Sequence, residues 1–317
     1  MKMKNKAVVY ALGLLMVMAV AINASATENS GAAFLKIGVG ARPIGMGGAF
    51  VALANDANAV FWNPAGISQL KSQQIGAMHT QWISDITYDY VGYVSPVGKG
   101  AIGISGVYLS SGSMDRRGSG GEALGSFGAY DTSVALSYAR QLTGVVHMGI
   151  NVKLIQQSIE DETANGFAVD IGQMYMLPVS GLSAGIAVQN IGPQMKFIEE
   201  PFSLPLTVTA GVGYKMLGGL TLGMDVKHQV VDSITSISVG TEYFPVSMLA
   251  LRAGYLAKML KSTDDFGSVA GQDTNMASLT GLGAGVGFKL GSTSVDYAFV
   301  PYGDLGNTHR ISILASF

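Results

Sequence analysis

Apolar side chains recur at every second position along most of the chain from about residue 73 onwards. In one such segment, residues 220–227, four apolar side chains alternate with threonine, glycine, aspartate and lysine. A strand that lies between lipid and a polar lumen has this period of two. Strands of a soluble sandwich alternate in the same way, but they average about 5–6 residues, whereas tilted membrane strands need about 9–11. The length of the segments therefore favours membrane strands.

The alternation and the turn residues between segments predict an all-β fold, a transmembrane antiparallel β-barrel of about 14 strands, over residues 73–317. An even number is typical of bacterial single-chain barrels. The strands are expected over residues 73–82, 88–96, 100–110, 130–141, 146–159, 165–177, 182–191, 205–216, 220–230, 234–244, 247–257, 280–290, 293–300 and 309–317.

The connections between these strands alternate in length. Short turns alternate with longer polar or glycine-rich segments, which are residues 111–129, 192–204, 258–279 and 301–308. Short periplasmic turns and longer outer loops are the usual pattern of such barrels. In the third strand, Ile102 and Ile104 are out of phase with Val107 and Leu109, which predicts a β-bulge between them, near Ser105.

The composition agrees with a membrane protein that lacks spanning helices. The chain of 317 residues is 48% hydrophobic and only 13% charged, against about 25% charged residues in soluble domains. Beyond the N-terminus it contains no run of about 18 apolar residues, which excludes helical spans. A sheet closed on itself is then the remaining way to satisfy every backbone polar group in lipid.

The N-terminus predicts export. Three lysines precede an apolar run at residues 7–22, and Ala24-Ser25-Ala26 fits a cleavage site, so residues 1–26 are expected to be a signal peptide. A membrane anchor is the less favoured interpretation, because the run is short. Export through the inner membrane leads to the outer membrane, where lipid and the barrel-assembly machinery are the expected partners. The formal charge of −2 disfavours nucleic acid as a partner.

The chain offers no motif for a cofactor or a metal. It has no cysteine, and its four histidines lack the spacing of metal ligands. Gly38-Val-Gly40-Ala-Arg-Pro43 begins like a dinucleotide loop but has no strand–helix–strand unit around it. Gly181-Leu-Ser183-Ala-Gly185 has the spelling of a serine-hydrolase elbow, yet Ser183 falls inside an alternating strand rather than at a strand-to-helix turn. No cofactor and no enzymatic activity are expected.

Residues 27–72 depart from the alternation. They are glycine-rich, with short helices expected over residues 49–58 and 63–70. Their aromatic side chains are too apolar for a solvated tail. We expect this segment to form a plug in the lumen or at its periplasmic end, with four residues as a candidate lining for a hydrophobic ligand: Phe34, Phe50, Phe61 and Trp62.

Charged residues fall on the predicted lumen side of the strands. Both signs occur, so mutual pairing is favoured over a selective path for a solute. Arg42 and Asp56 in the plug are candidate partners for these wall charges. The lumen set is Lys153, Asp170, Lys215, Asp225, Lys227, Glu242, Arg252, Asp296 and Arg310, with Lys289 on the same side. At the C-terminus, the aromatic Phe317 ends an amphipathic strand and is a candidate assembly signal.

Three blocks carry a resemblance to a known family. The first is Gly40-Ala-Arg-Pro-Ile-Gly-Met-Gly-Gly-Ala-Phe50 with Phe61-Trp-Asn-Pro-Ala-Gly66; the second is Leu182-Ser-Ala-Gly-Ile-Ala-Val-Gln-Asn-Ile-Gly192 before Leu204-Pro205; the third runs from Val295 to Ser312. Together they resemble the PorV/PorQ family, which belongs to the FadL-like group of outer-membrane barrels.

The resemblance implies a fourteen-stranded barrel whose N-terminal segment enters the lumen, with a plug motif at Arg42 and at Asn63, Pro64, Ala65 and Gly66. It also implies a role in type IX secretion, in which the barrel binds an exported protein client or secretion-system subunits. The alternative is a FadL-type channel for hydrophobic small molecules. A lipid O-deacylase activity at Ser183 is a minor alternative.

Overall fold

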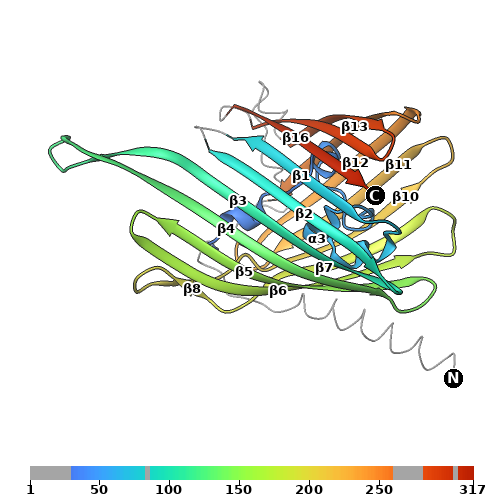
Figure 1. The fold of residues 1–317 in the computed structure, drawn as a ribbon, viewed down its shortest axis with the longest axis horizontal. Helices are drawn as coiled ribbons and strands as arrows, with labels where there is room; N and C mark the ends of the chain where they lie inside the picture. Colours follow the sequence, from blue (N-terminus) through green and yellow to red (C-terminus); the bar gives the residue numbers. More distant parts are fainter. Residues whose placement is uncertain (1–29, 83–85, 260–280, 303–305) are drawn as a thin grey trace.

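The chain folds into a closed antiparallel β-barrel (Figure 1). The computed structural model describes residues 30–82, 86–259, 281–302 and 306–317. The predicted signal peptide and nearly all of the predicted loop at 258–279 lie outside the described residues. Within them, fourteen strands form one sheet in the order β1-β16-β15-β14-β13-β12-β11-β10-β7-β6-β5-β4-β3-β2, and β1 pairs with β16 to close it. The predicted fold class is confirmed.

The strand limits match the alternation closely. The barrel strands are β1 (Gln74–Gln81), β2 (Thr87–Val97), β3 (Gly100–Arg117), β4 (Ala123–Gln141), β5 (Val146–Ile159), β6 (Glu162–Met176), β7 (Leu182–Ile191), β10 (Thr207–Lys215), β11 (Leu220–Gln229), β12 (Ile234–Val246), β13 (Leu249–Met259), β14 (Leu282–Leu290), β15 (Thr293–Pro301) and β16 (Asn307–Ser316). A small separate sheet pairs β8 (Met195–Lys196) with β9 (Pro201–Phe202).

The helices are short and lie in the N-terminal segment. They are η1 (Ala33–Lys36), α2 (Ala41–Gly45), α3 (Ala59–Trp62) and η2 (Pro64–Gln69). A 3-10 helix thus replaces the helix expected over 63–70, while the helix expected over 49–58 is wrong because that stretch forms turns. In the described part of the chain, no helix has the length and apolar character to cross a membrane.

The segment predicted as an outer loop, residues 111–129, is instead mostly strand. It extends β3 and β4 into a hairpin that projects beyond the barrel (Figure 1). The pairing passes from Ser110↔Tyr130 to Ser113↔Gly128 through a register shift. Beyond that point the ribbon has no alternating apolar face to bury, because both of its faces meet solvent. Periodicity therefore could not reveal these strands.

The bulge predicted near Ser105 is also wrong. β3 keeps an unbroken register with β2 and β4 from Gly100 to Ser110. Ile102 and Ile104 face outward, whereas Val107 is buried inside the barrel and Leu109 packs beside it against the core. The apparent change of phase arises because apolar residues of the N-terminal segment fill the lumen. Apolar side chains of this strand therefore pack on its inner face as well as facing outward.

The barrel has two different ends. At one end, which we call the short-turn end, the strands are joined by residues 98–99, 142–145, 177–181, 216–219, 247–248 and 291–292. We call the opposite end the long-loop end. Short turns mark the periplasmic side of outer-membrane barrels. Phe317 lies at the short-turn end with its side chain exposed, and its backbone exchanges hydrogen bonds with Gln73 at 3.0 and 3.1 Å.

A charge on the outer face is expected to destabilise the barrel more than a charge at the lumen. On β11, Met224 is exposed on the outside, whereas Thr221 lines a polar cavity inside. Met224→Lys should cost roughly 2–4 kcal/mol near the midplane of the bilayer. Urea unfolding in lipid vesicles measures the free energy of both variants. Equal losses for Met224→Lys and Thr221→Lys would show that the two faces are wrongly assigned.

Candidate functional site

The N-terminal segment, Ser30–Leu70, lies inside the barrel and is called the plug from here on (Figure 1). Its apolar side chains form one buried cluster with residues of the wall. Phe34, Phe50 and Trp62 are buried, and Phe61 packs against them from the edge of the cluster. The ring centroids of Phe50 and Phe61 lie 6.2 and 5.6 Å from that of Trp62. These four residues therefore fill space and line neither of the two cavities described below.

A row of glycines on the inner wall holds the backbone of the plug. Cross-strand pairs join five glycines on five consecutive strands: Gly213, Gly223, Gly240, Gly254 and Gly283. A Cβ at four of them would overlap backbone atoms of the plug between Ile44 and Ala49, and at Gly213 it would meet Leu53. We call this row the glycine seat. It gives part of the high glycine content, 43 residues, a direct packing reason.

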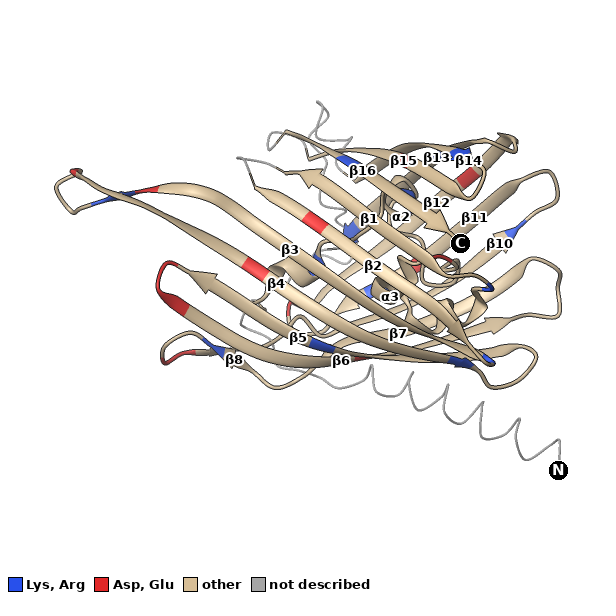
Figure 2. Cartoon of the chain, viewed as in Figure 1, with Lys and Arg blue, Asp and Glu red and all other residues tan. Residues whose placement is uncertain are grey.

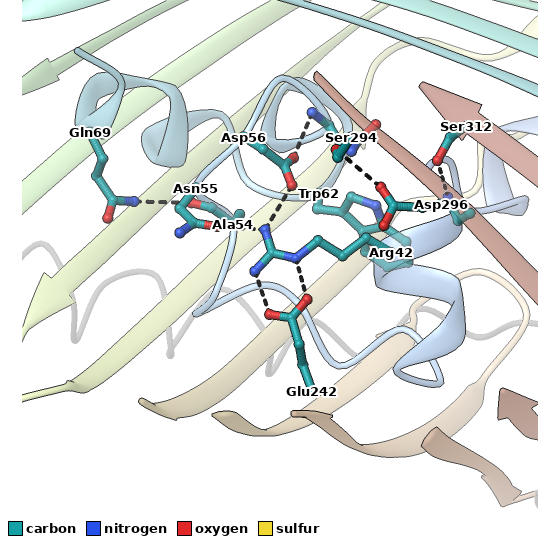
Figure 3. A network of polar contacts seen from close by, with 12 residues as sticks. Arg42, Ala54, Asn55, Asp56, Trp62, Gln69, Glu242, Ser294, Asp296 and Ser312 are labelled. Carbon is teal, nitrogen blue, oxygen red and sulfur yellow. Dashed lines mark hydrogen bonds and ion pairs between the residues drawn. The ribbon is translucent and has the colours of Figure 1, made fainter. Parts of the chain in front are cut away.

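A chain of charges ties the plug to the wall, and Figure 3 shows its contacts from Arg42 to Asp56 and Glu242. Arg42 of α2 donates to both carboxylate oxygens of Glu242 at 2.9 Å and to Asp56 at 2.8 Å. Glu242 also accepts from Arg252 at 2.8 Å, and Arg252 reaches Asp296 at 2.6 Å. Two cations and three carboxylates thus alternate across β12, β13, β15 and the plug. This arrangement anchors the plug and leaves these charges satisfied rather than open to a solute.

Two further polar groups of the wall bind the plug. The Asp225 carboxylate accepts hydrogen bonds from the backbone N–H groups of Phe50 and Val51 at 2.7 and 2.8 Å. Asn151 donates to the carbonyl of Val60 at 2.7 Å and to Asp170 at 2.9 Å. Buried plug backbone, which lacks regular helix or sheet partners here, is therefore satisfied by side chains of the barrel.

The plug motif acts as a local brace. The side chain of Asn63 donates to the carbonyls of Val51 and Gln173 at 2.8 and 3.2 Å and accepts from the N–H of Ala65 at 3.2 Å. Pro64 and Ala65 lie against Gly149 of β5, so that a Cβ at Gly149 would overlap them. Gly66 sits under the carbonyl of Ala54. Each residue of the motif has a packing or hydrogen-bonding role.

Of the remaining predicted lumen charges, four contact partners inside the barrel and Lys215 is exposed at its rim. Lys153 pairs with Asp170 at 2.7 Å and is buried, and Arg310 donates to the carbonyl of Gly38 at 2.6 Å. Lys227 is half-buried over the ring of Trp62, 5.4 Å from its centroid. Lys215 is exposed at the rim and lines both cavities.

Two cavities lie at the short-turn end. The larger, about 390 Å³, is bordered by the Arg42 network and by hydroxyl side chains of β15 and β16. The smaller, about 150 Å³, lies between the plug and the β6–β7 turn. Most of its lining is apolar: Ala52, Leu53, Met174, Met176, Leu177, Val179 and Leu182, with Gln69, Ser180, Gly181, Ser183 and Lys215 completing it. An apolar cavity of about 150 Å³ is large enough to hold one benzene ring.

Ser183 does not have the surroundings of a hydrolase nucleophile. Its hydroxyl donates to the carbonyl of Ala52 at 2.7 Å, and its other hydrogen-bond contact, at 3.3 Å, is the carbonyl of Gly213. Neither partner is a base. Among the described residues there is no group of three or more His, Cys, Asp or Glu side chains placed to hold a metal ion.

One anchor was not foreseen from the sequence. Asp232, in the β11–β12 connection, accepts hydrogen bonds from the backbone and side chain of Ser30 at 2.7 and 3.0 Å and from Lys36 at 3.1 Å. These residues are about 200 positions apart, and nothing local marks them as partners. The anchor fastens the beginning of the plug at the long-loop end.

This anchor is expected to loosen in acid. Burial alone would raise the pKa of Asp232, but the hydrogen bonds from Ser30 and Lys36 outweigh it and hold the pKa below its usual range. A depressed folded-state pKa stabilises the anchor above the unfolded value of about 3.9, and the contribution is lost as the pH falls through the folded value. The backbone amides of residues 30–36 should exchange with deuterium faster in that range, after correction for the intrinsic pH dependence of exchange, and those of the Asp232→Asn variant should already exchange at the faster rate at neutral pH. A wild-type rate independent of pH would contradict this.

Comparison with known proteins identifies a family and a fold. The model of "Uncharacterised protein family (UPF0164)" matches residues 16–280. No match was found among curated proteins.

Solved structures of similar fold include hydrocarbon channels. The monoaromatic hydrocarbon channel CymD has a TM-score of 0.64 and 13% identity, over 88% of this chain and 98% of its own. The Pseudomonas putida toluene transporter TodX has a TM-score of 0.64 and 14% identity, over 88% and 99%. A Pseudomonas aeruginosa FadL homologue has a TM-score of 0.58 and 11% identity, over 88% and 98%. The fold is therefore that of FadL-like outer-membrane barrels.

Proposed function

The chain belongs to the uncharacterised protein family UPF0164, and we propose that it is an outer-membrane channel that admits small hydrophobic molecules. The apolar cavity of about 150 Å³ beside the plug is the observation that carries the proposal. Its volume suits a single small ring, and most of its lining is apolar, although Gln69, Ser180, Ser183 and Lys215 also border it. The likeness in fold to channels for toluene and other monoaromatic hydrocarbons supports the same class of solute.

The route past the plug is proposed to end at this cavity. The glycine seat and the Arg42 network hold one side of the plug against β10–β15. The cavity lies next to this region, where β6 and β7 meet the plug at the short-turn end, and Lys215 of β10 also borders it. A solute that reaches it needs no separation of buried charges. Export by a cleaved signal peptide, assembly through Phe317 and residence in outer-membrane lipid are parts of the same proposal.

Uptake of radiolabelled toluene tests this function. Cells that express the chain should take up toluene faster than cells with an empty vector, with no change for a disaccharide. Val179→Trp places a ring at the mouth of the cavity and should lower the toluene rate severalfold. Val145→Trp, at an equally exposed turn residue that does not line the cavity, is the matched control. Equal toluene rates with chain and vector would refute the proposal.

A second candidate function is transfer of an exported protein, as the PorV/PorQ resemblance implies. The projecting β3–β4 hairpin favours it, because β3 from Ser113 and β4 up to Phe127 pair only with each other. Such a ribbon leaves two open edges that an extended client segment can join. Deletion of residues 112–127 should abolish crosslinking to a secreted protein or a secretion-system subunit, while toluene uptake persists. Unchanged crosslinks, or none in the wild type, would exclude this role.

A further inference from the structure

The exposed charges differ between the two ends of the barrel. Among the described residues, the long-loop end exposes seven acidic and four basic side chains, and Figure 2 shows the acidic ones at the tips of its hairpins. The short-turn end exposes five basic side chains and no acidic one in the same described ranges: Lys71, Lys99, Arg140, Lys215 and Lys289. None of the ion pairs within the described residues includes any of these five.

Three of the five cations line neither cavity and lie in a turn, at a strand end or just before a strand. Lys215 and Lys289 line the larger cavity and are set apart. Lys71 precedes β1, Lys99 lies in the β2–β3 turn, and Arg140 is at the end of β4. Arg140 pairs across the strands with Gly100, and the N–H of Gln141 donates to the carbonyl of Lys99 at 3.0 Å. The last two cations are thus close neighbours. We call Lys71, Lys99 and Arg140 the basic rim.

The basic rim borders the apolar outer surface directly. Tyr138 lies two residues before Arg140 on the same outward face and is 48% exposed. Val97 and Leu142, in or beside the adjacent turns, are 52% and 51% exposed. In a barrel that sits in a bilayer, the edge of the apolar surface meets the lipid headgroups. The cations therefore lie at headgroup depth, with apolar side chains beside them for the acyl chains.

We propose that the basic rim binds the headgroups of anionic phospholipids in the leaflet at the short-turn end. An ammonium or guanidinium group donates to phosphate oxygens, and Arg does so in a bidentate manner. Exposed acids, which would compete for the cations, are absent from this end in the described residues. The basic rim is continuous with the lipid-facing surface, which favours a lipid over an acidic protein as its partner. A lipid contacts the cations through its headgroup and Tyr138 and Leu142 through its acyl chains, so no second partner is needed. Basic clusters at a membrane boundary commonly select anionic lipids.

Native mass spectrometry of the purified full chain tests the site, with phosphatidylglycerol and phosphatidylcholine as probes at equal concentration. The wild type should retain phosphatidylglycerol in preference. A Lys71→Gln, Lys99→Gln, Arg140→Gln variant should bind it on the order of tenfold more weakly, as three cations each contribute to the attraction. The matched control is Arg117→Gln, Lys196→Gln, Lys258→Gln, which removes the same charge from exposed residues of the long-loop end and should bind as the wild type does.

Three results would overturn the proposal. Equal retention of both lipids by the wild type would mean that headgroup charge is not recognised. An acidic protein would then be the better candidate partner of the basic rim. Unchanged binding by the basic-rim variant would place the lipid elsewhere. An equal loss of phosphatidylglycerol binding in both triple variants would mean that the net charge of the protein, and not the basic rim, determines binding. Heat-induced gel mobility of each variant verifies that the barrel is folded, and toluene uptake is independent of all these outcomes.

Discussion

Replacement of Gly240 or Gly254 by alanine is expected to lift the plug off the barrel wall. A Cβ at Gly240 would overlap the carbonyl oxygen of Met46, and one at Gly254 would overlap Met46 and the amide of Gly47. These are backbone atoms, which cannot rotate away as the end of a side chain can. Overpacking of this kind costs about 1–3 kcal/mol per site, and the two neighbouring substitutions act on the same turn of the plug. We expect the double variant to populate a state with the plug displaced.

Cysteine labelling measures that state. The chain has no cysteine, so Ala54→Cys, at a fully buried plug position, gives a single reporter. A maleimide should react slowly in the parent and at least tenfold faster in the Gly240→Ala, Gly254→Ala variant, since each 1.4 kcal/mol changes an opening equilibrium tenfold.

Gly76→Ala is the matched control for this experiment. Gly76 also faces the lumen, but a Cβ there would meet Leu314 and Ala57 at 3.4 and 3.6 Å, which is ordinary contact. Its labelling rate should equal that of the parent. If Gly76→Ala exposes the reporter thiol as much as the double variant does, the glycine seat has no special role and the effect belongs to strand glycines in general.

The barrel could be predicted from the sequence because each strand has the same environment, with lipid on one side and the lumen on the other. Lipid on one side imposes the same alternation fourteen times, and the limits of β5 and β7 follow from it to the residue. The rule fails where its cause is missing. The β3–β4 hairpin has no lipid on its outer face, and Val107 meets the apolar plug rather than water.

The contents of the lumen were less predictable. Charge on the inward positions indicated pairing, and Arg42 does pair with Glu242 of the wall, whereas Asp56 pairs with Arg42 instead of a wall charge. The connections Arg42–Glu242 and Arg252–Asp296 join residues 200 and 44 positions apart. No periodicity carries such information. The aromatic residues of the plug suggested a lining for a hydrophobic ligand. Phe50 and Phe61 pack against Trp62, but an aromatic side chain suits a core and a binding site equally well, so the lining stays a prediction.

Glu242→Gln is expected to have the largest effect of any single charge change. Glu242 is 1% exposed and is the only carboxylate in the network that binds two guanidinium groups, Arg42 and Arg252. Its loss leaves the buried Arg252 and the half-buried Arg42 with one carboxylate each, Asp296 and Asp56. Breaking a buried ion pair from one side typically costs 3–5 kcal/mol, because desolvation of the remaining charge is no longer compensated. Urea unfolding in lipid vesicles measures the loss, followed by tryptophan fluorescence in a Trp82→Phe background so that the signal comes from Trp62 in the plug.

The same experiment separates the plug's anchorage from general barrel stability. Glu200→Gln removes an exposed acid of the long-loop end and should change the free energy of unfolding by less than about 0.5 kcal/mol. Combining Glu242→Gln with Arg42→Met removes both members of the plug-to-wall pair, so the double loss should fall short of the sum of the single losses by about 0.5–3 kcal/mol. Additive losses would mean that Arg42 and Glu242 act separately. The plug would then be held by the glycine seat, the Asp225 hydrogen bonds and the Asp232 anchor, without a contribution from coupling between Arg42 and Glu242.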